Sequence, residues 1–513
     1  MPNVQRSKRL KKWIALIGLM CGVSMLFLDS TVLPVATPTI QIDLRVSSTG
    51  INWVINVYFL AMATLVLACG RLADMYGHRR IFSIGMVIFA LASIFGGMAL
   101  TSTWLISARC LQGIGGAMMG PASWAIIIDI FPYKERGKAM GLLIGISSIF
   151  LSLGPSVGGF LTEFLSWRWI FWLNLPIALI GIALVLYSVP QTDDLSEESF
   201  DIPGFITFSA ALASLTIALM QGRVWGWGSP VIVLLLIIAV LFFFLLYVTD
   251  RIAQHPFIDF KLYTKRIYLG GSIIVFAVQF LLMISVFWPI FFQKALGLSP
   301  LQAGAVTLFS TIPVIVSAPL SGWMQDRFGP RLPILIGFTI ASFCLGWFAI
   351  FLQFDNVKNL IPGLFFYGIS MALIMTPNSA STLAILPPRK RGLGSGMFYT
   401  ARYTGGTLGI ALFGSMIINV RHFNFASRLA ENPATATLSP KLFWGLLANA
   451  HDALAQLNAL EPHIQTLVKS AFYASYHFAF VVTHIFALSV ALIALIISHL
   501  TYRNEAGSNG AEG

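Results

Sequence analysis

Charged residues are scarce in this 513-residue sequence, where Asp, Glu, Lys and Arg together make up 10% and hydrophobic residues make up 57%. A soluble globular domain carries about 25% charged residues, which keep its surface compatible with water. The composition therefore excludes an ordinary soluble protein and indicates a polytopic membrane protein.

Cysteine is also rare, and the sequence patterns of catalysis are missing. The four cysteines all lie inside apolar segments, where we expect them to pack as small hydrophobic residues: Cys21, Cys69, Cys110 and Cys344. We find no Cys/His spacing typical of a zinc site, no nucleophile with a nearby base and no phosphate-binding loop. The sequence therefore predicts no metal, no cofactor, no enzymatic activity and no use of ATP.

Long apolar runs dominate the chain, and we identify fourteen that are long enough to cross a bilayer as helices of about 20 residues. The runs are continuous rather than alternating, which excludes the strands of a membrane barrel. The expected spans are residues 13–37, 51–70, 81–99, 104–128, 138–162, 169–189, 203–221, 230–249, 268–292, 303–324, 332–353, 360–384, 393–419 and 473–500. We predict an all-α membrane protein with 14 transmembrane helices.

Basic residues outnumber acidic ones, with a formal net charge of +12. They stand in small groups beside apolar runs, a pattern that sets membrane orientation rather than one that binds nucleic acid. With the N-terminus inside, the inner segments hold more than twice as many Lys and Arg residues as the outer loops. This bias predicts that both termini are cytoplasmic.

A charged turn interrupts the apolar runs twice. Residues 70–80 read Gly-Arg-Leu-Ala-Asp-Met-Tyr-Gly-His-Arg-Arg, and residues 322–331 repeat the spacing Gly-x3-Asp-x2-Gly-x-Arg. An Arg-Gly pair follows each turn at a similar interval, at Arg136 and at Arg391. Two copies of these landmarks predict two related halves. We expect a six-helix half at 1–190, a linker with two extra helices at 191–267, and a second six-helix half at 268–513 with an outer loop at 420–472.

The charges of the repeated turns and of neighbouring helix ends are candidates for a cytoplasmic gate, because such charges pair with each other and with helix dipoles. The alternative is that these charges only fix orientation, but acidic residues contribute little to orientation and both turns carry one. The candidate gating residues are Gly70, Asp74, Gly77, Arg79, Arg80, Asp129, Arg136, Asp326, Arg327 and Arg331.

One carboxylate, Asp29, lies well inside a predicted span. Counting about 1.5 Å per helical residue places Asp29 and Arg109 at similar depth in the outer part of the membrane. Intramembrane acids are usually functional, and burial and a nearby Arg shift their protonation in opposite directions. We predict that Asp29 binds and releases a proton next to Arg109. A permanent structural pair is the alternative.

Polar residues in other spans are candidates for lining a substrate cavity. They are Asn52, Asn56, Tyr58, Gln279, Asn378, Arg402 and His484. Arg402 could attract an anionic group or neutralise an acid across the interface, since an unpaired charge inside a span is costly. His477 shares a helix face with His484, and buried neutral histidines more often pack than relay protons.

The outer loop contains apolar residues at helical spacing between residues 454 and 468. We expect an amphipathic helix that rests on the outer membrane interface. Docking of a partner is the less favoured alternative.

Several motifs resemble those of one family of transporters. The turn at 70–80 is similar to the signature loop between helices 2 and 3 of the major facilitator superfamily, and residues 109–117 (Arg-Cys-Leu-Gln-Gly-Ile-Gly-Gly-Ala) resemble its helix-4 motif. Residues 28–32 and 167–176 resemble motifs of its fourteen-span drug:proton antiporter branch, the EmrB/QacA type. Pro34 and Phe150 depart from the branch pattern, near the substrate path that the resemblance implies.

The helix-5 motif of the superfamily's antiporters is matched by Gly154, Pro155, Gly158 and Gly159. A Gly-Pro step bends a helix, and the glycines allow another helix to pack closely. The resemblance implies that this bend favours exchange over leakage.

The resemblance implies a major facilitator fold and a proton-coupled exporter of small amphipathic compounds in a bacterial inner membrane. Export of a specific metabolite such as a siderophore, and proton-coupled uptake, are the alternatives. The expected partners are the substrate, protons and membrane lipid. We expect a monomer and no nucleic acid, and the resemblance also allows a periplasmic adaptor with an outer-membrane channel.

Overall fold

The computed structural model describes residues 2–46, 48–191, 200–253, 256–298, 300–354, 356–432, 434–435, 456–457 and 459–503. Within these residues the regular structure consists of α-helices and short 3-10 helices, without strands. The predicted all-α class is therefore confirmed. Residues 192–199, at the start of the predicted linker, lie outside the described residues.

The first part of the chain forms a group of helices that pack on one another. In order they are α1 (Pro2–Asp43), α2 (Ser48–Tyr76), α3 (His78–Gly97), α4 (Ser102–Ile130), α5 (Tyr133–Phe164), the short α6 (Trp169–Trp172) and α7 (Asn174–Ser188). Helix α1 lies against α5 and α7, and α4 lies between α2 and α3. We call this set the N-terminal group.

Two helices follow that pack chiefly on each other, α8 (Ile202–Trp225) and α9 (Pro230–Ile252). Helix α8 also lies against α2 and against α16 (Arg391–Glu431). Helix α9 buries few of its apolar side chains inside the protein, as expected for a helix that faces lipid.

The remaining elements form the C-terminal group. They are α10 (Phe260–Tyr263), α11 (Arg266–Leu282), η1 (Met283–Phe287), α12 (Trp288–Lys294), α13 (Pro300–Phe328), α14 (Arg331–Phe351), η2 (Val357–Asn359), α15 (Ile361–Ala384), η3 (Pro388–Lys390), α16 and α19 (Pro462–Thr501). Helix α15 lies against α13 and α14, and α16 lies against α11 and α19.

Thirteen helices among the described residues are long and apolar enough to cross a membrane. The predicted fifth span, 138–162, falls on α5, a helix of 32 residues that includes side chains outside the described part. The number fourteen stays a prediction.

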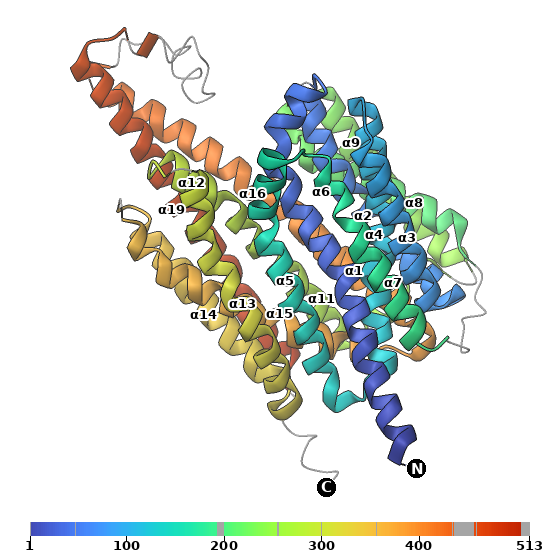
Figure 1. Cartoon of the computed structure of the whole chain (residues 1–513). Coiled ribbons are helices and arrows are strands. Elements are labelled where there is room, and N and C mark those ends of the chain that lie inside the picture. Colours follow the sequence, from blue (N-terminus) through green and yellow to red (C-terminus); the bar gives the residue numbers. More distant parts are fainter. Residues whose placement is uncertain are drawn as a thin grey trace.

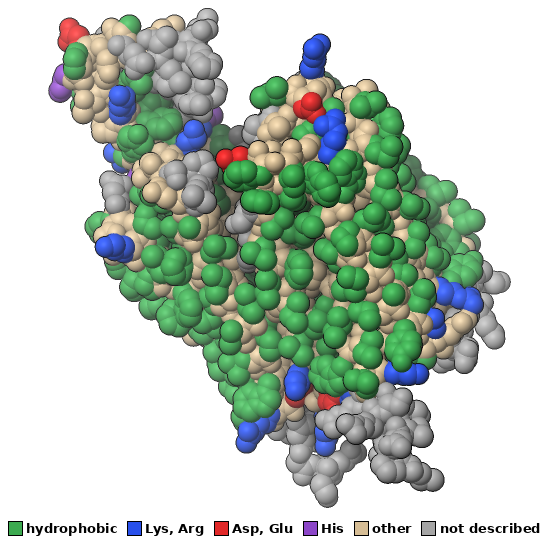
Figure 2. Space-filling view, in the orientation of Figure 1, with side chains coloured by type: hydrophobic (Ala, Val, Ile, Leu, Met, Phe, Trp, Pro, Cys, Tyr) green, Lys and Arg blue, Asp and Glu red, His purple; other side chains and the backbone are tan. Residues whose placement is uncertain are grey.

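The start of α1 and the end of α19 lie at the same end of the helical bundle, which we call the termini face (Figure 1). Figure 2 shows hydrophobic side chains over the middle of the molecule and charged side chains gathered towards its two ends. This distribution fits an apolar belt between two aqueous surfaces.

The two groups approach most closely near the termini face, through glycines on α5 and α13 and on α2 and α16. A Cβ atom on Gly141 would lie 3.0 Å from Pro319 Cα, and one on Gly396 would lie 3.0 Å from Leu67 Cα. A Cβ atom on Gly137 would lie 2.7 Å from the carbonyl oxygen of Gly322. Side chains at these positions would force the groups apart, so the structure is closed at this face.

The prediction of an amphipathic helix on the membrane interface is wrong for the described part of the outer loop. Helix α16 continues to Glu431 and α19 begins at Pro462, so residues 420–431 and 462–472 extend the flanking helices. Leu457 and Val468 pack against Phe425 and Leu429 of α16. The apolar face of this part of α19 is thus covered by α16. The end of α16 and the start of α19 protrude together from the bundle at the upper left of Figure 1, and we call them the protruding hairpin.

Candidate functional site

Asp29 on α1 and Arg109 on α4 form a buried ion pair, each 1% exposed. The guanidinium donates through Nη1 to the Asp29 carboxylate and to Gln112 Oε1 at 2.9 Å, and through Nε to the carbonyl of Val54 at 3.2 Å. It also stacks over the Tyr58 ring, 4.3 Å from the centroid. The structure thus brings together the two residues predicted for proton coupling, and a buried charge of this kind depends on such partners.

A chain of neutral polar groups extends from this pair, and sequence reasoning missed it. Gln112 Nε2 donates to Asp29 Oδ1 at 3.2 Å and to Ser93 Oγ at 2.8 Å. Asn174, at the start of α7, donates to the same hydroxyl at 3.4 Å. Because Gln112 lies three residues after Arg109, helical spacing on one face could have indicated it. Its amide serves both members of the ion pair.

Aromatic residues from both helix groups lie along the interface between the groups, and Tyr58 contacts the ion pair directly. The Tyr58 hydroxyl is buried without a hydrogen-bond partner among the described residues, and Tyr58 interacts electrostatically with Asp29, Arg109 and Tyr403 of α16. Tyr399 packs on Trp124 of α4, with ring centroids 6.2 Å apart, and on Tyr403 at 5.9 Å. The interface between the groups is therefore aromatic where α4 meets α16.

Arg402 on α16 is partly exposed at the same interface. Its Nε donates to Gln279 Oε1 at 2.9 Å, and its guanidinium lies 5.6 Å from the centroid of the Tyr399 ring. No carboxylate pairs with it within the described residues. The predicted cavity residues Tyr58, Gln279 and Arg402 thus lie near the interface.

The other predicted cavity residues have different positions. Asn378 is buried within the C-terminal group, where it donates to the Gly271 carbonyl and accepts from Tyr502. His484 is 0% exposed, accepts from Trp288 Nε1 at 3.2 Å and donates to the Phe480 carbonyl. The hydrogen bonds of both side chains thus lie inside one group, and their role in lining a cavity stays a prediction. Asn56 is partly exposed on α2, and the Asn52 side chain lies outside the described residues.

His477 lies on the same helix, α19, about two helical turns before His484. Its Nδ1 contacts the Leu352 carbonyl, and its ring packs edge-on against Phe291. These contacts lie inside the C-terminal group, where they pack α19 against its neighbours.

A set of hydrogen bonds joins the two groups at the termini face, and we call it the first lock. Asp74, at the end of α2, accepts hydrogen bonds from the backbone N–H groups of Gly392 at 2.5 Å and Leu393 at 2.6 Å. These are orphan donors at the start of α16, where a helix favours negative charge. Gly70 lies against the backbone of Gly392 in the same contact. The first repeated turn therefore holds α16 of the opposite group.

The first lock also includes His78 and Asp129. His78 Nε2 lies 3.1 Å from Asp74 Oδ1, and His78 Nδ1 lies 2.8 Å from Asp129 Oδ2. Asp129 pairs in turn with Arg391 across the interface. His78 does not stand out in the sequence, because a histidine within a basic turn resembles one more charge that sets membrane orientation.

A second lock repeats this arrangement with the groups exchanged. Asp326, near the end of α13, accepts from the backbone N–H of Gly137 at 3.1 Å and of Lys138 at 3.0 Å, at the start of α5. Each repeated Asp thus caps the helix that begins near the Arg-Gly pair of the other group. The repeated turns lie on one face, as the proposed duplication requires.

The remaining gating candidates lie near the locks and make other contacts. Arg79 donates to the Leu186 carbonyl at 2.7 Å, and Arg136 donates to the carbonyls of Phe131 and Ile128 at the end of α4. Arg331 contacts the carbonyl of Arg503, and Arg80 is exposed. Gly77 has a φ of 94°, a conformation that glycine adopts without strain, and it separates α2 from α3.

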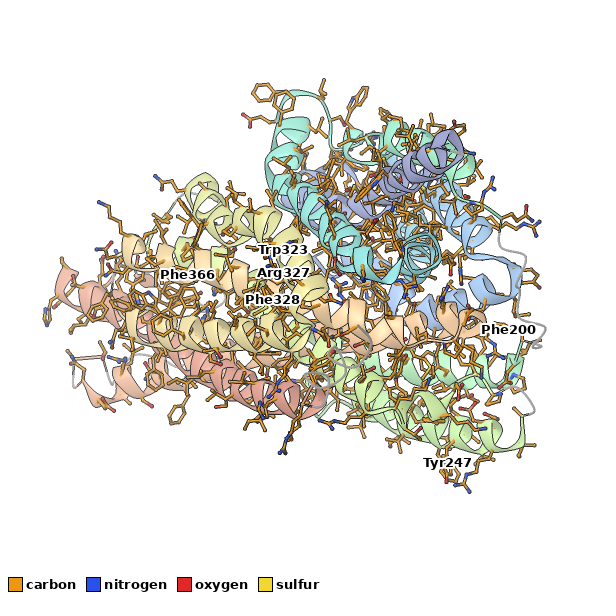
Figure 3. The ribbon with its side chains drawn as sticks, turned by 90° about the horizontal axis from the view of Figure 1, so that it is seen from below. Phe200, Tyr247, Trp323, Arg327, Phe328 and Phe366 are labelled. Atoms are coloured by element: carbon orange, nitrogen blue, oxygen red, sulfur yellow. The ribbon has the colours of Figure 1, made fainter. Side chains whose placement is uncertain are left out.

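Arg327 does not take part in either lock. Its guanidinium lies 5.5 Å from the ring centroid of Trp323 and 5.4 Å from that of Phe328. Both aromatic residues are about half exposed at the end of α13, and Figure 3 shows the three side chains together in the view from the termini face. Arg and Trp at such a position are typical of a helix end at a membrane interface. The gating role of Arg327 stays a prediction.

The helix-5 motif packs on α1, next to the buried acid. A Cβ atom on Gly158 would lie 2.6 Å from the Val32 carbonyl oxygen, and Gly154 lies against Thr31. Thr31 Oγ1 donates to the Leu151 carbonyl at 2.9 Å. Gly159 is partly exposed, and the Pro155 side chain lies outside the described residues. The glycines therefore allow α5 to touch the helix that carries Asp29.

Asp43 is the last residue of α1, at the end of the bundle opposite to the termini face, and it contacts the loop before α6. It accepts from Trp167 Nε1 and from Arg168 Nη1, both at 2.8 Å. The Trp167 and Arg168 hydrogen bonds hold the pKa of the Asp43 carboxyl below its usual value. This contact ties the end of α1 to the loop before α6.

The Asp43 contact predicts a small acid-sensitive contribution to stability. A carboxyl whose pKa is lower in the folded state stabilises the fold above the unfolded pKa of about 3.9 and loses this effect as the pH falls through the folded value. We expect Asp43→Asn to lower the melting temperature at neutral pH and the difference from wild type to shrink below about pH 4. Thermal unfolding in detergent at several pH values measures it, and a difference that grows in acid would contradict the assignment.

No group of three or more His, Cys, Asp or Glu residues placed to hold a metal ion occurs within the described ranges.

Comparisons with known proteins agree with this architecture. The family model of the Major Facilitator Superfamily matches residues 19–282 and 267–426. The riboflavin transporter RibZ of Clostridioides difficile (strain 630) is 30% identical over 81% of this chain and 90% of its own length. The multidrug resistance protein Stp of Mycobacterium tuberculosis (strain CDC 1551 / Oshkosh) is 32% identical over 79% and 75%. The tetracenomycin C resistance and export protein of Streptomyces glaucescens is 30% identical over 98% and 94%.

Among solved structures, the crystal structure of the human organic anion transporter MFSD10 (TETRAN) superposes with a TM-score of 0.61 at 12% identity, covering 96% of this chain and 99% of that one. This likeness concerns the fold alone. With the family model spanning most of the sequence and two repeated locks joining two helix groups, the chain belongs to the major facilitator superfamily and is an integral membrane transporter rather than an enzyme.

Proposed function

We propose that this protein is a proton-coupled exporter of small amphipathic compounds that works by alternating access, with the termini face in the cytoplasm. The single observation that carries the proposal is the buried pair of Asp29 and Arg109, an ionisable site inside a membrane span. Intramembrane acids of this kind are expensive to keep and commonly mark proton pathways.

Protonation of Asp29 would change the contacts of α1 with α4. A neutral Asp29 no longer balances the charge of Arg109, whose remaining partners are Gln112, the Val54 carbonyl and the Tyr58 ring. Arg109 stays charged in either case, because its guanidinium does not lose its proton in proteins. The proton therefore alters how strongly α1 holds α4, which is a differential interaction of the kind that shifts a conformational equilibrium.

The two locks would oppose inward opening. Asp74 and Asp326 bind helix starts of the opposite group, so both pairs of hydrogen bonds break when the termini face opens. Proton entry from outside and release inside would supply about 2.3 kcal/mol per 100 mV for each proton.

The substrate region that we propose lies at the interface beside Tyr58, Trp124, Tyr399, Tyr403 and Arg402. Aromatic rings offer apolar contact area with polar edges, which suits amphipathic compounds. Arg402 adds a cation that no described carboxylate balances.

The relatives support export of toxic compounds, since Stp is a multidrug resistance protein and the Streptomyces glaucescens relative is a resistance and export protein. The riboflavin transporter among the relatives favours the second candidate, transport of a metabolite. A bacterial inner membrane, a monomeric state and an optional periplasmic adaptor with an outer-membrane channel belong to the same proposal.

The experiment is transport in proteoliposomes with an imposed pH gradient, using a panel of fluorescent amphipathic dyes and metabolites. We expect movement of substrate against its gradient in exchange for protons, lost when an ionophore collapses the gradient. Substrate that moves in the same direction as protons would reject export and favour the uptake alternative.

Arg402 gives a separate prediction about the substrate region. Replacing Arg402 by Gln removes a charged donor, and because hydrogen bonds to charged groups contribute about 1.5–3 kcal/mol, we expect KM to change by about tenfold or more for at least some substrates. Arg428→Gln is the matched control, since Arg428 lies exposed on the same helix and bonds to Asn424. Equal KM values for the two variants across the panel would exclude Arg402 from the site.

A further inference from the structure

Arg402 carries a positive charge near the middle of the membrane. It lies about 17 Å along α16 from Arg391, where this helix begins at the termini face, and the apolar core of a bilayer is about 30 Å thick. The residue is partly exposed. A charge at this depth is costly in lipid, so such residues face water, a partner of opposite charge or a ligand.

The groups that the structure places against Arg402 within the described ranges are uncharged. Its Nε donates to Gln279 Oε1 at 2.9 Å, and its guanidinium interacts with Tyr399 and Tyr403. A guanidinium has five N–H donors in a planar fork, which matches the two oxygens of a carboxylate. Gln279 offers an acceptor without a charge, so the charge of Arg402 is not balanced by these contacts.

The sequence offers no spare acid that could balance Arg402 from another span. Of its 20 Asp and Glu residues, only Asp29 falls inside one of the fourteen predicted spans. Asp29 already forms the buried ion pair with Arg109. Asp29, Arg109 and Arg402 together therefore carry one positive charge in excess inside the bundle.

The helix face that carries Arg402 is turned towards the N-terminal group. Tyr399, Arg402 and Tyr403 are three and four residues apart, a spacing that places them on one face of α16. Across the interface, Tyr399 packs on Trp124 of α4 with ring centroids 6.2 Å apart, and Tyr403 interacts electrostatically with Tyr58 of α2. A ligand between the groups at this face would meet the cation and the aromatic rings together.

We propose that the substrate is an aromatic anion, a flat apolar body that carries a carboxylate or sulfonate bound by Arg402. The inference rests on the substrate region assigned under the proposed function, and it holds for export and for uptake. The guanidinium can bind such a group through two parallel hydrogen bonds, while the tyrosine and tryptophan rings contact the apolar body. An organic cation at the same place would meet a like charge and no free acid, because Arg109 holds Asp29.

The test compares three probes with the same ring system and different charges: pyrenecarboxylate, pyrenecarboxamide and pyrenylmethylammonium. Binding to the full-length protein is measured in nanodiscs of zwitterionic lipid at neutral pH and low salt, against empty nanodiscs. In wild type we expect the carboxylate to bind about tenfold or more tightly than the carboxamide, and the ammonium compound to bind most weakly. The carboxamide has a similar shape, so the ratio of the first two affinities isolates the charge.

Substitutions of Arg402 connect this ratio to one side chain. Arg402→Gln should lower the ratio to about one and leave the affinity for the carboxamide nearly unchanged, which also shows that the variant is folded. Arg402→Lys keeps the charge and should keep a preference for the carboxylate. Arg428→Gln is the matched control with the wild-type ratio, because Arg428 lies exposed on the same helix and bonds to Asn424.

Equal affinities for the carboxylate and the carboxamide in wild type would overturn the inference, and so would a preference that survives in Arg402→Gln. Because binding is measured without a proton gradient, the result is separate from the proposed function. Proton-coupled export of the carboxamide or the ammonium compound, without a preference for the carboxylate, would reject the anion site alone. A preference that depends on Arg402, in a protein without proton-coupled export, would support the anion site and reject the exporter.

Discussion

Replacing Asp29 by Asn is expected to abolish transport against a gradient while leaving movement down a gradient intact. Asn keeps the shape of Asp and cannot exchange a proton, so Arg109 retains a hydrogen-bonding neighbour and loses its titratable partner. One proton moving through 100 mV provides about 2.3 kcal/mol, which supports an accumulation of roughly fiftyfold, since 1.36 kcal/mol corresponds to a factor of ten. We expect this ratio to fall to about one in the variant.

The measurement compares substrate accumulation in proteoliposomes under an imposed pH gradient, together with counterflow in its absence. Removing one member of a buried ion pair can cost about 3–5 kcal/mol of stability, so counterflow also reports whether the variant is folded. Asp43→Asn is the matched control, because Asp43 lies on the same helix and faces water with 43% of its side chain exposed. Accumulation by Asp29→Asn equal to that of wild type would assign coupling to another group and leave the pair with a structural role.

The second large effect is expected at the first lock. Asp74→Asn removes the carboxylate charge that binds two backbone N–H groups at the start of α16 and one face of His78. Charge-assisted hydrogen bonds contribute about 1.5–3 kcal/mol each, so loss of the charge should shift the conformational equilibrium towards inward opening by roughly a hundredfold. Substrate would bind from the termini side more readily, and the return step would slow.

The two locks should differ in strength. Asp74 has 3% of its side chain exposed and bonds of 2.5 and 2.6 Å, whereas Asp326 is partly exposed with bonds of 3.1 and 3.0 Å. Water screens exposed charges, so Asp326→Asn should have the smaller effect. Distances between spin labels at Tyr76 and Pro388 measure the first lock, and Arg80→Gln in the same turn is the control. An equal shift in all three variants would remove the special role of Asp74.

Sequence patterns could predict the parts of this site that depend on one residue being unusual in its surroundings. Asp29 stands out as an acid in an apolar run, and its depth matched that of Arg109, so the pair was expected before their contact was seen. The repeated turns were likewise visible because charge interrupts apolar sequence at a fixed spacing. The helices followed from length and hydropathy, and most of their positions agree with the spans that the structure contains.

What could not be predicted depends on contacts between distant segments. Asp74 binds the backbone of Gly392 and Leu393, which carry no side-chain signal for this contact. The contact of His78 with Asp129 could not be predicted either, because only the fold brings α4 and its Asp129 to the second ring nitrogen of His78. Arg327 has the right spacing for a lock but lies on the outer side of α13, and spacing alone does not fix the direction of a side chain.

A small rotation of α16 at the first lock would move the protruding hairpin, at the other end of this helix, over a large distance. Helix α16 has 41 residues, so it is about 60 Å long, with Asp74 holding its first turn and the hairpin at its far end. A tilt of about 10° around the held end would carry Glu431 through about 10 Å. Because α16 is one continuous helix, its two ends move together. A fluorophore on the protruding hairpin would therefore report, from outside the membrane, when the first lock opens at the termini face.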